Sequence, residues 1–185
     1  MSGVDPLTRL ALQARAGNTD ALSAFVETGY EQVWRLCATL VGRQEADDAS
    51  QETFVRAVRS LSQFRGESSA RTWLLAIARH ACLDELRGRA RRQRRDTALE
   101  SSHEPLDADA SANATVSELI GRLDPDRRAA FVLTQVLGLS YDEASRVCEC
   151  PPGTIRSRVA RARADLVGFL SRAEGDGRQG RSSSA

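Results

Sequence analysis

The sequence predicts an all-α protein made of two small helical domains joined by a flexible linker. Apolar residues recur every three to four positions through most of the chain, and no segment shows a convincing strand-like alternation. The segment Gly88–Ala114 has almost no large apolar residue and no periodicity, which is typical of a linker. A chain of 185 residues can hold two domains of under ~100 residues each. The expected divisions are a first domain at 1–90, a linker at 91–114, a second domain at 115–172 and a disordered tail at 173–185.

The first domain should contain four helices. A short helix is expected over about 6–16, ended by Gly17, and a longer one to about Val41, capped by Asn18 or Thr19. The third should run over about 45–61 and the fourth over about 69–87, with Gly88 after its end.

The second domain should contain three further helical segments and a tight turn. Its expected landmarks, in chain order, are an apolar stripe at Val116, Leu119, Ile120 and Leu123, an N-cap at Asp124 before Pro125, a helix end at Gly138, a capping box of Ser140 and Glu143, a short helix to Cys148, a turn at Pro151–Pro152 and a last helix over about 153–170.

Composition is ordinary, but the charges are segregated. All 26 basic residues are arginine, which by itself fits a GC-rich genome, so only their placement is informative. Residues 87–95 hold six arginines and no acid, while 96–109 hold five acids and no base. No apolar run is long enough to span a membrane and no signal peptide is present, so a cytoplasmic protein without membrane insertion is expected.

The four cysteines are expected to be reduced core residues. Cys148 and Cys150 form a lone C-x-C with neither histidine nearby in sequence, which is a weak metal signature. Neither a metal nor a cofactor is predicted. The sequence also lacks a Ser-His-Asp order or a phosphate-cradling glycine loop, so an enzyme is not expected.

The last two helices have the anatomy of a helix-turn-helix. At 100° per residue, one narrow apolar stripe of the second helix should be buried, namely Ile155, Val159, Ala162 and Leu166. Arginines flank or oppose that stripe, with only small residues between them, and arginine grips phosphates and reads guanine edges. The alternative is an ordinary solvated basic face.

Two other helices carry features that spacing alone does not decide. Asp48 and Glu52 share a face beside Gln51, which suits a basic partner, but Arg56 could simply neutralise Glu52. On the fourth helix a stripe of mixed character should face outward, namely Trp73, Ala76, His80, Asp84 and Arg87. An exposed tryptophan beside cations suits stacking on unpaired bases, whereas a lone tryptophan also suits a core.

Two stretches of the sequence resemble one family. ADDASQETFVRAVRSLSQFRGESSARTWLLAIARHACLDELR resembles the second domain of sigma-70-type initiation factors, and LDPDRRAAFVLTQVLGLSYDEASRVCECPPGTIRSRVARARADL resembles their fourth domain. With little but a linker between them, the chain resembles an extracytoplasmic-function (ECF, group 4) sigma factor over roughly 18–170.

The resemblance implies three binding surfaces. Docking on the β′ clamp of core RNA polymerase is implied for Asp48, Gln51, Glu52 and Arg56, with the β subunit as a further contact. Binding and opening of the −10 promoter element are implied for Phe64, Arg65, Ser68, Arg71, Trp73, His80, Asp84 and Arg87. Major-groove binding at the −35 element is implied for Thr154, Arg156, Ser157, Arg158, Arg161 and Arg163. An anti-sigma protein is a further candidate partner.

Three positions depart from the family pattern. His80 stands where many relatives have Asn, and Ala160 replaces a residue that is often larger. Glu149 occupies a turn position where Gly is frequent, at a cost of ~1 kcal/mol if its backbone is left-handed.

Two hypotheses remain open at this stage. A stand-alone helix-turn-helix regulator that needs no polymerase is the alternative function. In either case the flexible linker could let the acidic face at Asp47, Asp48 and Glu52 pair in cis with the arginines of the last helix and hide both surfaces.

Overall fold

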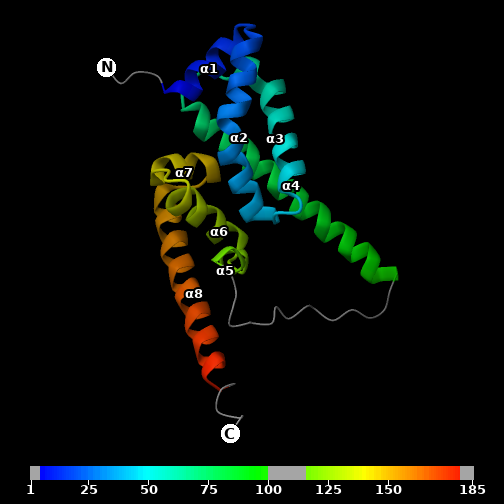
Figure 1. Ribbon diagram of the computed structural model, residues 1–185, viewed down its shortest axis with the longest axis vertical. Helices are drawn as coiled ribbons and strands as arrows, with labels where there is room; N and C mark the ends of the chain where they lie inside the picture. Colours follow the sequence, from blue (N-terminus) through cyan, green and yellow to red (C-terminus); the bar gives the residue numbers. More distant parts are fainter. Residues whose placement is uncertain (1–4, 100–115, 180–185) are drawn as a thin grey trace.

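A computed structural model describes residues 5–99 and 116–179, with side chains over 5–95 and 116–172. Every regular element of these segments is helical, as expected (Figure 1). The elements are α1 (Pro6–Arg15), α2 (Thr19–Val41), α3 (Ala46–Ser60), η1 (Leu61–Gln63), α4 (Ala70–Leu99), α5 (Val116–Gly121), α6 (Pro125–Phe131), η2 (Val132–Val136), α7 (Tyr141–Cys148) and α8 (Pro152–Gln179). No helix of these segments is long and apolar enough to cross a membrane.

The first domain packs α1, α3 and α4 around the long helix α2. Its core is aliphatic and aromatic, with Phe25, Leu36 and Leu74 almost fully buried. The helix starts agree with the local signals in the sequence. The Asn18 side chain accepts a hydrogen bond from the Ala21 amide at 2.9 Å, as a capping residue should.

Helix α4 is longer than the sequence predicted. The expected end was about Arg87, yet the helix continues through Gly88 to Leu99 (Figure 1). Arg89 explains much of this extension, because its guanidinium donates to the Val41 carbonyl at 3.0 Å and to Glu85 at 3.2 Å. These contacts tie the turn after Gly88 to the end of α2 and offset the low helix propensity of glycine. The remainder of the expected linker, 100–115, lies outside the described residues.

The second domain packs α6 and α7 against the first half of α8. Leu133, Val147 and Ile155 are fully buried at its centre. The predicted capping box is present: the Ser140 hydroxyl accepts from the Glu143 amide at 3.2 Å, and the Glu143 carboxylate accepts from the Ser140 amide at 2.8 Å. The helix that was expected to run evenly from Pro125 to Gly138 instead widens into the π-helical turn η2.

Helix α8 also continues beyond the expected boundary at 172 and ends at Gln179. No proline follows Pro152 in the sequence, so no residue is present that would block the helix outright. The tail was expected to be disordered from 173. The structure shows helix over 173–179, and the last residues, 180–185, lie outside the described part of the chain.

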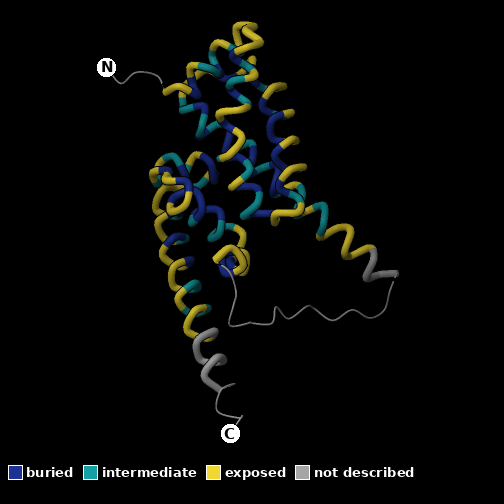
Figure 2. Tube along the Cα trace, viewed as in Figure 1, coloured by how far each residue is buried: buried dark blue, intermediate teal, exposed yellow. Residues whose placement is uncertain are grey.

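The two domains pack directly against each other, with α4 against α7, and α2 against α5 and α6. Figure 2 shows buried segments on both sides of this junction. Two backbone carbonyls accept hydrogen bonds across it: Arg71 donates to Leu137, and Arg128 donates to Leu40 at 3.0 Å. Burial lowers the pKa of Arg128 from its ordinary value.

Candidate nucleic-acid interface

Helix α3 presents an exposed acidic face. Asp48, Gln51 and Glu52 are all exposed there. Arg56 pairs with Glu52 at 2.7 Å and with Asp84 of α4 at 2.7 Å, so the neutralising alternative holds for Glu52. The hydrogen bond from Arg56 lowers the pKa of Asp84. Asp48 and Gln51 make no side-chain hydrogen bond or ion pair to other described residues, which leaves both for a partner.

Asp47, the residue directly before Asp48, has an internal role that the sequence did not indicate. Its carboxylate accepts from the indole Nε1 of Trp34 at 2.8 Å and from the Tyr30 hydroxyl at 3.3 Å. This carboxylate therefore joins α3 to α2.

The stripe that holds Trp73 is partly or fully exposed along its length, as expected, but the Trp73 ring itself is less exposed than its position on the helix predicted. It is partly buried, with its ring centroid 4.9 Å from that of Phe64 and 6.5 Å from that of Phe25. Phe64 is itself only 4% exposed. The loop between η1 and α4 is tied to α1, because Arg15 donates to the Phe64 carbonyl at 2.8 Å, and its Phe64 ring packs against Trp73 of α4. Both aromatic residues of the expected −10 set thus contribute to packing.

A surface pocket of about 300 Å³ opens where this loop meets Trp73. It is lined by Trp73 and by the loop residues 63–68. Arg65 is exposed at its rim, 3.9 Å from Glu67, and Ser68 is half-buried. The loop and the tryptophan therefore form one polar-rimmed, aromatic-walled pocket from Phe64, Arg65, Ser68 and Trp73.

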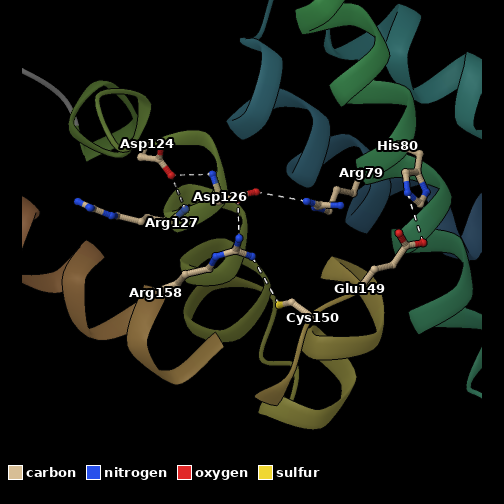
Figure 3. Close-up of polar contacts among 8 residues, drawn as sticks. All are labelled: Arg79, His80, Asp124, Asp126, Arg127, Glu149, Cys150 and Arg158. Carbon is tan, nitrogen blue, oxygen red and sulfur yellow. Dashed lines mark hydrogen bonds and ion pairs between the residues drawn. The ribbon is translucent and has the colours of Figure 1, made fainter. Parts of the chain in front are cut away.

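The remaining residues of the expected −10 set follow α4 away from the pocket. Arg71 is turned toward the second domain and donates to the Gln32 side chain as well as to Leu137. His80 lies 3.5 Å from the Glu149 carboxylate of the second domain (Figure 3). Asp84 and Arg87 are exposed and lie 3.5 Å apart. Arg71 and His80 are thus occupied by the second domain, whereas Asp84 and Arg87 are not.

Helix α8 begins after the expected tight turn and buries the expected stripe. Ile155, Val159 and Ala162 are at most 2% exposed, and Leu166 is partly buried. Glu149 in the turn is left-handed, with φ 53° and ψ 45°, as its position suggested.

The polar side chains of α8 differ in their exposure and in the partners that they already contact. Arg161 is exposed and has no ion pair to any described residue. Arg156 lies over the Tyr141 ring at 5.9 Å, and Arg163 donates to the Gln135 side chain at 2.6 Å. Thr154 is partly buried, and the exposed Ser157 donates to its carbonyl at 2.9 Å.

Arg158 does not lie free on the basic face. Its guanidinium lies 2.5 Å from the Asp126 carboxylate and 3.5 Å from the Cys150 sulfur, and its side chain is only 23% exposed. Asp126 also pairs with Arg79 of α4 at 3.3 Å, so one carboxylate serves arginines from both domains (Figure 3). Sequence reasoning missed both Arg79 and Asp126, and no local signal identifies a contact between residues 47 positions apart.

The expected pairing of the acidic α3 face with the arginines of α8 is wrong. Within the described segments, the α8 arginines 156, 158, 161 and 163 make no ion pair with α3. The second domain instead engages Arg71, Arg79 and His80 of α4. The domains do meet in cis, but through α4 and not through the acidic face.

Comparison with known proteins identifies both domains. Residues 25–92 match Sigma-70 region 2, and residues 114–166 match Sigma-70, region 4. The chain is 46% identical over 168 residues to the ECF RNA polymerase sigma factor SigC of Mycobacterium tuberculosis, covering 88% of this chain and 90% of that one.

Two solved structures share the fold. CnrH in complex with the cytosolic domain of CnrY matches with a TM-score of 0.69 and 28% identity, over 90% of this chain and 98% of that one. The sigma factor RpoE in complex with the anti-sigma factor NepR from Bartonella quintana matches with a TM-score of 0.66 and 25% identity, over 80% and 96%. The chain belongs to the ECF group of the sigma-70 family and is an RNA polymerase sigma factor, not an enzyme.

Proposed function

We propose that this sigma factor directs core RNA polymerase to its promoters through three separate surfaces. The observation that carries the proposal is the aromatic-walled pocket of about 300 Å³ beside Trp73 at the start of α4. A concave pocket with an aromatic wall and a few polar groups suits one unstacked base. Its position on the family's second domain supports a role in holding melted −10 DNA.

The second surface is the first half of α8, which we assign to the −35 element. Arg161 is available for a bidentate contact with guanine, while Arg156 and Arg163 need only release weak partners to reach DNA. Arg158 is set apart from this group, because its pairing with Asp126 supports a structural role.

The third surface is the exposed α3 face, which we assign to the β′ clamp of core polymerase. Asp48 and Gln51 have no competing contacts among the described residues, and Glu52 shares Arg56 with Asp84. An exposed acidic helix face suits a basic partner and favours fast, salt-sensitive association.

The packing of the two domains has a consequence for this function. With the two domains packed together, the second domain contacts Arg71 and His80, so the proposed −10 face of α4 is only partly accessible to DNA. We propose that core polymerase separates the domains when it binds. An anti-sigma protein is a further proposed partner, supported by RpoE having been solved in complex with the anti-sigma factor NepR. Its action would take place in the cytoplasm, with the polymerase.

Transcription from a genomic promoter library with purified core polymerase, with and without this protein, tests the proposal. We expect a defined set of start sites that requires both components, and no footprint from the protein alone at the same concentration. Tight duplex binding without polymerase, and no new start sites with it, would instead favour the stand-alone regulator.

A further inference from the structure

The extension of α4 beyond the first domain divides its arginines between two sides of one helix. Arg89 and Arg92 lie on one side, where Glu85 pairs with Arg89 at 3.2 Å and with Arg92 at 2.8 Å, and Glu45 of the loop before α3 pairs with Arg89 at 2.8 Å. These contacts anchor the extension to the first domain. They leave the other arginines of the run for a different use.

Four arginines lie on the opposite side. At 100° per residue, Arg87, Arg91, Arg94 and Arg95 fall within an arc of about 100°, centred about 140° away from Arg89 and Arg92. All four are exposed. Arg87 has only a 3.5 Å contact with Asp84, and the other three have no ion pair to any described residue. Like charges at these spacings repel one another weakly, and an anion that contacts several of them would relieve that repulsion.

This basic strip, the set Arg87, Arg91, Arg94 and Arg95, continues the functional face of α4. On the same helical wheel Trp73 and His80 fall within about 40° of Arg87 and Arg91. A rise of 1.5 Å per residue places Arg91 and Arg95 ~27 to 33 Å along the helix from Trp73. That distance corresponds to ~8 to 10 base pairs of duplex at 3.4 Å each. Figure 1 shows this part of α4 extending beyond α3, away from the other helices.

We propose that the basic strip binds phosphates of duplex promoter DNA between the −10 and −35 elements. The inference rests on the proposed function, because it takes the pocket beside Trp73 as the −10 site. Arginine without base-edge geometry supplies affinity and not sequence preference. The basic strip would therefore bind the DNA between the two elements whatever its base sequence.

The test compares a triple variant with a charge-matched control. The variant carries Arg91→Gln, Arg94→Gln and Arg95→Gln, since glutamine keeps helix propensity and removes the charge. The control carries Arg9→Gln, Arg35→Gln and Arg43→Gln, three exposed arginines elsewhere in the first domain. Both are assembled with core polymerase and titrated on a promoter fragment selected by the wild-type holoenzyme from a genomic library.

We expect the triple variant to bind the full duplex promoter at least about tenfold more weakly than the control. The slope of log K against log salt should become shallower by about 2 to 3, since each lost phosphate contact removes ~0.9. On a fragment that keeps the −10 single strand but lacks the duplex upstream of it, variant and control should bind alike.

Three outcomes would overturn the proposal. Equal salt slopes for variant and control would show that the strip touches no DNA. A defect that persists on the fragment without upstream duplex would place the strip on single-stranded DNA. A matching loss of affinity for core polymerase would make it a polymerase contact, which is a real alternative because Arg91 also borders the groove beside Asp48 and Glu52. Failure of the proposed function itself would differ from all three, because wild-type protein would then form no promoter complex with core.

Discussion

Replacing Trp73 separates its part in folding from its part in DNA opening. The ring is partly buried and packs 4.9 Å from the Phe64 ring, so Trp73→Ala removes both apolar burial and an aromatic pair. A fully buried tryptophan costs ~3–5 kcal/mol on truncation to alanine. Partial burial scales this to about 2 kcal/mol, and the aromatic pair adds ~0.5–1.5 kcal/mol. We therefore expect the free energy of unfolding of the first domain to fall by about 2.5–3.5 kcal/mol.

Trp73→Leu is the sharper variant for the DNA question. Leucine keeps much of the apolar contact with Phe64 and Phe25, so the stability loss should be about 1 kcal/mol. It removes the flat ring on which a base can stack, which is worth ~1–3 kcal/mol per base. Promoter opening by the holoenzyme should therefore weaken by about 5- to 150-fold.

The assay is fluorescence of 2-aminopurine placed in the −10 element, with chemical denaturation of each free variant measured alongside. A template with a pre-melted −10 bubble should restore part of the lost complex formation for Trp73→Leu. If Trp73→Leu opens the promoter at the wild-type rate, while Trp73→Ala fails only in proportion to its instability, the ring is a core residue and its assignment to DNA is refuted.

Four further variants test exposed residues, one strained position and one ion-paired arginine. The double change Asp48→Arg with Glu52→Arg should change the free energy of unfolding by no more than about 1 kcal/mol, because both side chains are exposed. Titration with core polymerase should show a sharp loss of affinity. Unchanged affinity for core polymerase would contradict the assignment of the α3 face. Glu149→Gly should raise the free energy of unfolding by about 0.5–1 kcal/mol. Relief of the left-handed backbone is worth ~1–2 kcal/mol, and this exceeds the entropic cost of glycine, ~0.5–1 kcal/mol. The control Glu149→Ala should not raise the melting temperature. Arg161→Ala should relax preference at one −35 base pair by ~1–3 kcal/mol in a selection from randomised −35 sites. Arg158→Ala should leave that base preference unchanged and lower the stability of the second domain. A lost base preference with unchanged stability would instead show that Arg158 contacts DNA.

Most of the fold could be predicted from local signals along the chain. Asn18 and Ser140 cap helices because each needs only a side-chain oxygen and the amide three residues later. The buried stripe at Ile155 and Val159 follows from helical periodicity alone. Such interactions lie within one or two turns, so a single sequence contains all the information that they require.

Contacts between distant segments account for the errors. Periodicity put Trp73 on a mixed face of its helix, but its burial depends on a loop that folds back through the Arg15 contact with the Phe64 carbonyl. Composition made 88–99 look like a linker, although Arg89 attaches that stretch to the end of α2. The position of Arg158 on the helical wheel placed it on the basic face. Its guanidinium instead pairs with Asp126, which lies 32 positions earlier in the sequence. None of these partners can be read from the helix on which the residue lies.

The buried position of Arg79 restricts what can take the place of the second domain on α4. Its side chain is only 10% exposed, its one ion-pair partner in the described structure is Asp126, and its Nε has no acceptor among the described residues. In the proposed separation of the domains, Asp126 would leave with the second domain, and the Arg79 guanidinium would lose its counter-charge. Water can solvate it, but any molecule that covers the same patch must present a carboxylate, a phosphate or a backbone carbonyl at that point. A purely apolar surface would leave a buried cation unpaired. Arg79 thus favours binding partners that place a hydrogen-bond acceptor or an anion at this point of α4. Promoter DNA and acidic protein surfaces both meet that requirement.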